Sequence, residues 1–190
     1  KIEVIHNGID TDQVFYPRDV KALKEKYGLQ KKKIVLSVAP NIMDERKGGK
    51  IVLGLSEKLK EIQFVLIGTE ETQRYSDNVL LIQRTKNQNE LAEWYSAADV
   101  FLICSKRENF PTTCLEALAC GTPIVWIDAC GTKETAPEPY GIFFRNPSLE
   151  KLEDGIIEQI ERNESTIRIS LYAKELYSKQ KMYDKYKRLY

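Results

Sequence analysis

Residues 99–128 read DVFLICSKRENFPTTCLEALACGTPIVWID, and this stretch decides the fold. Its two ends, residues 99–104 and 123–128, are short apolar runs that are typical of buried strands. Between them lie a polar loop and a helical pattern over residues 113–119, which begins after Pro111 and Thr112 and ends before Gly121. A strand, a helix and a second strand in this order predict two parallel strands joined by a helical crossover.

The same alternation extends to both sides of this unit. Apolar runs at residues 33–39, 63–68, 79–83 and 141–144 predict four more buried strands, and helical patterns cover residues 49–60 and 88–98. We therefore expect an α/β fold, a Rossmann-like doubly wound parallel sheet with helices on both faces.

The chain is expected to form a single domain over residues 1–190. Residues 1–16 form an N-terminal interdomain segment with a strand at residues 1–5, residues 17–148 form the Rossmann-like core, and residues 149–190 form a helical tail. In the tail, Leu152, Ile156, Ile157 and Ile160 recur at helical spacing, which predicts one buried face that closes over the sheet.

Composition excludes several classes of protein. With 42% hydrophobic and 30% charged residues among 190, the chain is neither disordered nor a disulfide scaffold. Its net charge of +1 supplies no field for nucleic acid, so no nucleic-acid partner is expected and any anion site must be local. The apolar runs are too short to span a membrane.

The cysteines and the single histidine do not indicate a metal site. Cys104, Cys114, Cys120 and Cys130 lack the close pairing of zinc or redox sites, and His6 lies far from them in the sequence. We interpret the cysteines as buried, reduced thiols, which favours a cytoplasmic location.

Two glutamates follow the strand at residues 99–104. In an open parallel sheet, ligands bind beyond the carboxyl ends of the strands, and neither G-x-G-x-x-G nor a complete P-loop is present. The free N–H groups around Thr112 to Cys114, at the start of the helix, are expected to form an anion cradle, with Glu108 and Glu116 facing the same cleft. Alternatively, Glu116 interacts only with the helix dipole and Glu108 only with solvent.

Glu108 and Glu116 have the spacing E-x7-E, and the surrounding string SKRENFPTTCLEALACGTPIV is similar to the donor-site signature of retaining GT-B glycosyltransferases of family 4. Residues 4–10 (VIHNGID), the pair Lys47-Gly48, residues 95–104 and residues 130–134 resemble further blocks of that family in the same order. The resemblance covers residues 1–134 firmly and the tail loosely. It implies the C-terminal, nucleotide-sugar-binding half of a GT-B enzyme, without the N-terminal acceptor half.

The resemblance also implies roles for individual residues. Glu116 would accept hydrogen bonds from the ribose hydroxyls, and Glu108 would approach the transferred sugar and the charge at its anomeric carbon. Arg46 and Lys47 would neutralise the leaving diphosphate. The family usually has an arginine where this chain has Asn41, so Arg46 is expected to replace it, with Lys106 or Arg107 as alternatives. The sugar and phosphate would contact the segment made of Asn109, Phe110, Pro111, Thr112 and Thr113, and the base would contact Arg84 and Thr85.

The implied reaction needs no cofactor and no metal ion. The donor would be a UDP or GDP sugar, and the acceptor a glycan or lipid-linked sugar bound by the missing half, in bacterial surface polysaccharide biosynthesis. This fragment would bind donor without turning it over. Two other functions remain open: a nucleotide-sugar epimerase of GT-B architecture and a non-catalytic nucleotide-binding module.

The end of the tail combines tyrosines with basic residues. Tyr177, Tyr183, Tyr186 and Tyr190 alternate with lysines and Arg188. We favour a helix that crosses to the other half of the enzyme, and a peripheral contact with the inner face of the membrane is the alternative.

Overall fold

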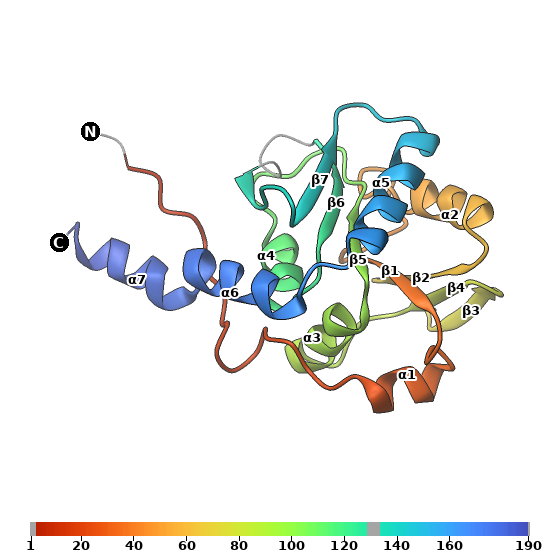
Figure 1. Cartoon of the computed structure of the whole chain (residues 1–190), viewed down its shortest axis with the longest axis horizontal. Coiled ribbons are helices and arrows are strands. Elements are labelled where there is room, and N and C mark those ends of the chain that lie inside the picture. Colours follow the sequence, from red (N-terminus) through yellow and green to blue (C-terminus); the bar gives the residue numbers. More distant parts are fainter. Residues whose placement is uncertain (1–2, 129–133, 190) are drawn as a thin grey trace.

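The computed structural model describes residues 3–128 and 134–189, which form one layered α/β fold (Figure 1). Seven strands form one sheet in the order β3-β4-β2-β1-β5-β6-β7. The strands are β1 (Lys33–Val38), β2 (Ile62–Ile67), β3 (Gln73–Ser76), β4 (Val79–Ile82), β5 (Val100–Ile103), β6 (Ile124–Ile127) and β7 (Gly141–Phe144). All neighbouring pairs are parallel except β3 and β4.

Without β3, the strand order is that of a Rossmann-like, doubly wound sheet, which confirms the predicted fold class. All six predicted strands are present. β3 was not predicted, because all four of its residues are exposed and leave no apolar run to recognise. It connects β2 to β4 as an antiparallel edge strand.

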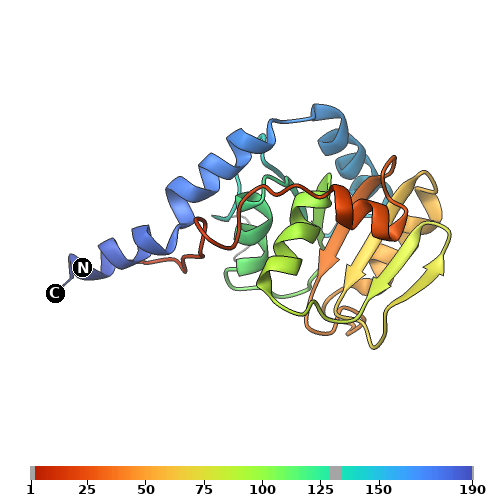
Figure 2. The same cartoon turned by 90° about the horizontal axis from the view of Figure 1, so that it is seen from below.

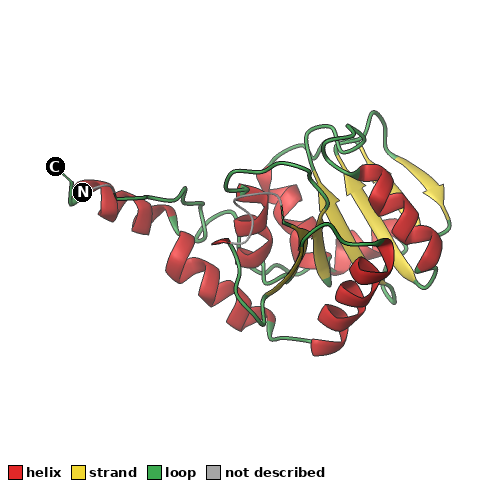
Figure 3. Cartoon of the chain, turned by 90° about the horizontal axis from the view of Figure 1, so that it is seen from above, coloured by secondary structure: helices red, strands yellow, loops and turns green. Residues whose placement is uncertain are grey.

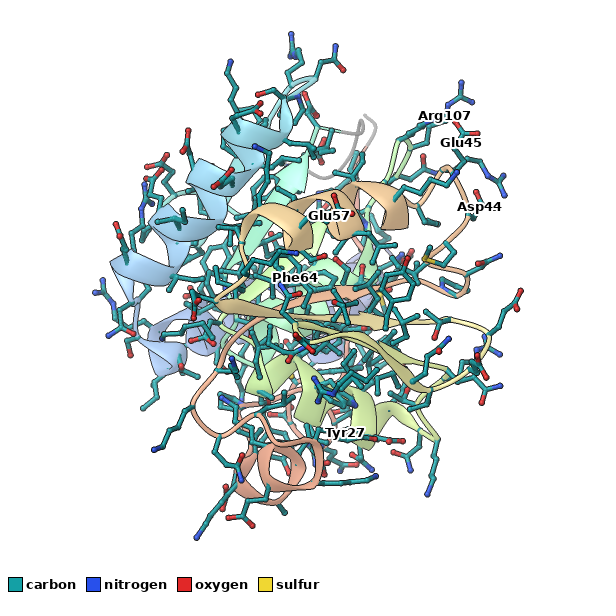
Figure 4. All side chains as sticks on the ribbon, turned by 90° about the vertical axis from the view of Figure 1, so that its right-hand side faces the viewer. Tyr27, Asp44, Glu45, Glu57, Phe64 and Arg107 are labelled. Carbon is teal, nitrogen blue, oxygen red and sulfur yellow. The ribbon has the colours of Figure 1, made fainter. Side chains whose placement is uncertain are left out.

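Helices cover both faces of the sheet, as Figure 3 shows. They are α1 (Lys21–Tyr27), α2 (Gly49–Lys58), α3 (Gln88–Ala97), α4 (Thr112–Ala119), α5 (Leu149–Arg162), α6 (Thr166–Tyr177) and α7 (Lys179–Lys187). On one face, α2 and α5 pack over buried Phe64, which lies inside the layer in Figure 4. On the other face, buried Trp94 and Leu115 anchor α3 and α4, with α1 packed on α3 and α6 on α4. Burial of these large apolar side chains is the main stabilising contribution to the fold.

The helical tail covers the sheet over only part of its length. Leu152 and Ile156 of α5 are buried against the sheet, as the spacing predicts. However, α6 packs on α4 instead, where the Ser170 hydroxyl donates to the Ala119 carbonyl at 2.7 Å. No residue of α7 is buried, and this helix projects away from the domain (Figure 1). The expectation that the whole tail closes over the sheet is therefore wrong beyond α5, because α4 offers α6 its own apolar surface.

The N-terminal segment runs beside the tail rather than forming a strand. Residues 3–5 have no strand partner, so that part of the predicted strand at residues 1–5 is wrong, and residues 1–2 lie outside the described residues. Instead, the Ile9 N–H donates to the Tyr177 carbonyl and the Lys179 N–H to the Ile9 carbonyl, both at 2.8 Å. An ion pair of 2.5 Å joins Lys179 Nζ to Asp10 Oδ2. Figures 1 and 2 accordingly show both termini at the same end of the molecule.

Three of the four cysteines are buried, free thiols, as predicted. Burial raises the pKa of each of the Cys104, Cys114 and Cys120 thiols to about 12. Cys130 lies outside the described residues. Within residues 3–128 and 134–189, no helix has the length and hydropathy required of a membrane span.

Candidate functional site

The strand order reverses between β1 and β5, which lie side by side in the sheet. The loops that follow these two strands therefore bound a crevice at the carboxyl ends, where ligands collect in folds of this kind. The Lys106 N–H donates to the Arg46 carbonyl at 2.8 Å and joins the two loops directly. The loop after β1 carries Lys47, and the loop after β5 carries Glu108.

Gly48 determines how closely the two loops approach. Its φ of +78° lies in the left-handed region, and a Cβ added there would lie 2.4 Å from the Cys104 carbonyl oxygen. Only glycine meets both conditions without strain. The chain therefore has a glycine directly after Lys47, which holds that lysine against the end of β5.

Lys47 and Glu108 form an ion pair across the crevice. Lys47 Nζ donates to Glu108 Oε1 at 2.7 Å, and the two side chains are 32% and 20% exposed. The structure thus brings together two residues that are far apart in the sequence and that the sequence assigned to one site.

A cleft of about 540 Å³ is lined by Arg46, Lys47, Lys106 and Arg107. Among them, Arg46 is directed to Asp44, with Nη2 2.8 Å from Asp44 Oδ2, and is 80% exposed. The hydrogen bonds from Arg46 hold the pKa of the Asp44 carboxyl well below its usual range. Figure 4 shows Asp44, Glu45 and Arg107 extending outward at the same edge. The four lining side chains are basic, and three of them, Arg46, Lys47 and Lys106, are paired with carboxylates.

Helix α4 points its first turn toward the same edge of the sheet. Pro111 precedes it as the N-cap, and no side chain caps the helix. The N–H groups of Thr112 and Thr113 have no partner within the helix. The Cys114 N–H, which was expected to be free as well, donates to the Pro111 carbonyl at 3.1 Å. The predicted anion cradle therefore consists of the first two N–H groups of the helix.

Glu116 lies in the second turn of α4 and is half-buried. Its Oε2 accepts a hydrogen bond of 3.0 Å from the Tyr95 hydroxyl. Burial raises the pKa of Glu116, and the hydrogen bond from Tyr95 opposes that rise. Glu116 therefore does not interact with the helix dipole alone, because one of its oxygens is held by the Tyr95 hydroxyl.

The ring of Phe110 is occupied by packing. It stacks on His6 with ring centroids 4.3 Å apart and meets the edge of Tyr177 at 6.0 Å. His6 Nε2 also lies 3.7 Å from Glu134 Oε2. The N-terminal segment and the tail are thus attached to the loop after β5, a connection that no sequence motif indicated.

Arg84 and Thr85 are not part of the Lys47–Glu108 cluster. They follow β4, which is separated from β1 by β2. Arg84 is exposed and Thr85 half-buried. Nearer to β1, a hollow of about 180 Å³ is lined by Asn41, Met43, Thr69, Glu70, Glu71, Gln73 and Leu81. Most of its lining comes from the loops that follow β1 and β2, and only Gln73 belongs to the unpredicted β3.

Tyrosines of the tail differ in their surroundings. Tyr177 is buried, whereas Tyr183 and Tyr186 are 50% and 46% exposed. Tyr190 lies outside the described residues, as do residues 130–133 of the last block that resembles family 4. In the part of the chain that the structure describes, no three His, Cys, Asp or Glu side chains are grouped as metal ligands would be.

Comparisons with known proteins identify the family. Residues 19–176 match Glycosyl transferases group 1, and the chain belongs to this family. It is 26% identical over 145 residues to N-acetyl-alpha-D-glucosaminyl L-malate synthase of Bacillus anthracis, covering 70% of this chain and 37% of the relative. It is 30% identical over 139 residues to D-inositol 3-phosphate glycosyltransferase of Mycobacterium bovis, covering 66% and 28%.

Solved structures show the same fold. Sucrose-phosphate synthase of Thermosynechococcus elongatus matches with a TM-score of 0.82 at 23% identity, covering 99% of this chain and 51% of that one. HepE of Anabaena in complex with UDP matches with a TM-score of 0.83 at 17% identity, covering 98% and 56%. The chain therefore spans about half the length of these structures and has the fold of the C-terminal half of GT-B glycosyltransferases.

Proposed function

We propose that this chain is the donor-binding half of a retaining glycosyltransferase, which transfers a sugar from a nucleoside diphosphate to an acceptor. The observation that carries the proposal is the ion pair between Lys47 and Glu108 at the mouth of the crevice, next to the first turn of α4. The site combines a cation and free N–H groups, which suit the anionic diphosphate of a donor, with a carboxylate, which suits its neutral sugar.

The diphosphate is assigned to the positive side of this site. When the bond between the anomeric carbon and the phosphate oxygen breaks, negative charge develops on the leaving diphosphate. Lys47 and the N–H groups of Thr112 and Thr113 stabilise that charge, and Arg46 adds to the positive potential of the cleft wall. These groups support a metal-independent reaction.

The sugar is assigned to Glu108 and to the backbone of Asn109, Phe110, Pro111, Thr112 and Thr113. As the bond to the leaving group breaks, the anomeric carbon becomes positively charged, and a carboxylate near it is stabilising. Glu108 is 20% exposed, so solvent screens its charge only partly.

The nucleoside is assigned to Glu116 for the ribose and to the region of Arg84 and Thr85 for the base. A carboxylate only accepts hydrogen bonds and can receive two hydroxyl donors, which matches a ribose diol. The likeness to HepE, solved with UDP and with UDP-glucose, supports a uridine nucleotide as the first to test.

The acceptor, a glycan or lipid-linked sugar, is assigned to a second half of the enzyme that would face this crevice. Exposed Tyr183 and Tyr186 on the projecting helix α7 support a contact of the tail with that half. We place the reaction in bacterial surface polysaccharide biosynthesis in the cytoplasm, at the inner face of the membrane.

Calorimetric titration of the chain with UDP, GDP and ADP tests the proposal. We expect one of the three nucleotides to bind. Lys47→Gln should lower the affinity for that nucleotide at least tenfold and leave the affinity for the corresponding nucleoside unchanged. Lys50→Gln is the matched control, because Lys50 is an exposed lysine in the first turn of α2. Added salt should reduce the difference between nucleotide and nucleoside. Equal effects of the two lysine variants, or no binding of any of the three nucleotides, would refute the proposal.

A further inference from the structure

Glu116 is held by a buried side chain, Tyr95, to which the sequence assigned no role. Tyr95 in α3 is 0% exposed, and its hydroxyl lies 3.0 Å from Glu116 Oε2. A carboxylate oxygen can only accept, so the phenol is the donor. The contact joins the second turn of α4 to the last turn of α3, two helices on the same face of the sheet.

The position of the Tyr95 hydroxyl is fixed by the core around its ring. The ring meets Phe101 of β5 edge to face at 5.3 Å and Phe15 of the N-terminal segment at 6.4 Å. The Tyr95 carbonyl accepts from the Thr122 hydroxyl at 2.6 Å, which fixes the backbone as well. The hydroxyl therefore cannot follow Glu116 into another rotamer.

The hydrogen bond from Tyr95 makes the two carboxylate oxygens of Glu116 different from each other. Oε2 is occupied by Tyr95, while Oε1 accepts no hydrogen bond within the described residues. A half-buried carboxylate with one oxygen fixed presents its other oxygen in one direction. Fixed orientation reduces the entropy lost when a ligand hydroxyl binds.

We propose that Tyr95 is a positioning residue for ribose recognition, because its buried hydroxyl holds Glu116 in one rotamer with Oε1 directed to the nucleoside. The inference rests on the proposed function, in which Glu116 binds the ribose. Tyr95 itself touches no ligand, since its side chain is fully buried.

Charge supports the same role. Burial raises the pKa of Glu116, and the hydrogen bond from Tyr95 lowers it. Without Tyr95, more of the carboxyl would be protonated at a given pH, and a protonated carboxyl is a poorer acceptor.

Other titratable groups near Glu116 are the thiols of Cys114, in α4, and of Cys120, directly after α4. Burial raises the pKa of both thiols to about 12 and that of Tyr95 well above its usual value, so none of them titrates between pH 5 and 8. The charge of Glu108, on the loop after β5, raises the pKa of the Cys114 thiol, as does the charge of Glu116. Glu108 therefore lies close enough to matter, and pH profiles are compared only between variants that retain it.

The test is a double-mutant cycle with Tyr95→Phe and Glu116→Gln, measured by calorimetry with the tightest binder among UDP, GDP and ADP. We expect Tyr95→Phe to weaken that nucleotide three- to tenfold at pH 7. In the Glu116→Gln background the same substitution should have no further effect. Inorganic pyrophosphate, which tests the phosphate part of the site alone, should bind all four proteins equally. Tyr27→Phe is the control, since Tyr27 packs on Trp94 in the neighbouring part of α3, away from Glu116.

A second measurement does not depend on affinity. The pH titration of the Glu116 side-chain carboxyl, followed by carbon-13 NMR, should move to higher pH in Tyr95→Phe, and the fall of nucleotide affinity on acidification should begin at correspondingly higher pH. An equal loss in both backgrounds, or an unmoved titration, would mean that Tyr95 only packs the core. If Glu116→Gln itself leaves binding unchanged, the ribose assignment is wrong, which is a different outcome from failure of Tyr95→Phe alone.

Discussion

Lys47 Nζ lies 2.7 Å from Glu108 Oε1, so the cation assigned to the diphosphate and the carboxylate assigned to the sugar are partners of each other in the ligand-free site. Under the proposed function, an incoming diphosphate would take Glu108's place beside Lys47, and the displaced carboxylate would face the sugar. We therefore expect Glu108 to compete with the phosphate for Lys47.

Glu108→Gln should strengthen the binding of nucleoside diphosphate while abolishing transfer. Removing the charge frees Lys47 and removes repulsion of the phosphate, and partly exposed ion pairs of this kind are worth up to about 1 kcal/mol, or about fivefold in affinity. Calorimetry with UDP measures the first effect, and transfer assays on a protein that contains both halves measure the second.

Glu45→Gln is the control for this prediction. Glu45 pairs with Lys106 at 2.6 Å across the same two loops, but its side chain is 82% exposed. Glu45→Gln should leave both the affinity for UDP and the rate of transfer nearly unchanged. A weaker affinity for UDP in Glu108→Gln would contradict the competition between Glu108 and the phosphate.

Arg46→Gln should lower the affinity for UDP about two- to threefold, which is less than the effect of Lys47→Gln. The reason is that solvent and salt screen the charge of an exposed cation. In the structure Arg46 is bound to Asp44 and not to the Lys47–Glu108 pair. A loss as large as that of Lys47→Gln would instead show that Arg46 binds the phosphate directly, in place of the arginine expected at Asn41.

Glu116→Gln should stabilise the fold while it weakens nucleotide binding. The pKa of Glu116 is raised by burial, so the folded state holds a proton more tightly than the unfolded state and the wild-type chain loses stability as pH rises through that interval. Glutamine removes this cost. For a chain of this length, a gain of about 1 kcal/mol corresponds to an increase in Tm of about 2–4 °C.

The stability difference should depend on pH in a defined direction. It should be present at neutral pH and vanish below about pH 4, where the carboxyl is protonated in both states. Thermal unfolding of both proteins between about pH 3 and 8 measures this difference. A difference that does not change with pH would mean that the desolvation of Glu116 is not its cause.

The sequence predicted what depends on buried periodicity and missed what depends on exposed or long-range contacts. Strand β5 and the start of α4 follow from an apolar run and a proline, so their positions and the location of Glu108 were predictable. The antiparallel β3 was not, because its residues are exposed. The partner of Glu116 was not predicted either, since Tyr95 looks like an ordinary core aromatic until the packing of α3 on α4 is known.

Gly48→Ala should destabilise the chain by about 2–5 kcal/mol and weaken UDP at the same time. Part of the cost is the left-handed backbone, about 1–2 kcal/mol, and the rest is the overlap of the new methyl group with the residue that follows β5.

A Cβ at this position would lie 2.4 Å from the Cys104 carbonyl oxygen, whereas Gly28, with φ of +68°, has no atom within 4 Å of its Cβ position. Gly28→Ala is therefore the matched control, with an expected cost of about 1 kcal/mol from backbone conformation alone and no effect on UDP. Urea unfolding gives both free energies, and calorimetry gives both affinities. Equal destabilisation by the two substitutions would show that the close approach of the loop after β1 to the end of β5 does not hold Lys47 in position.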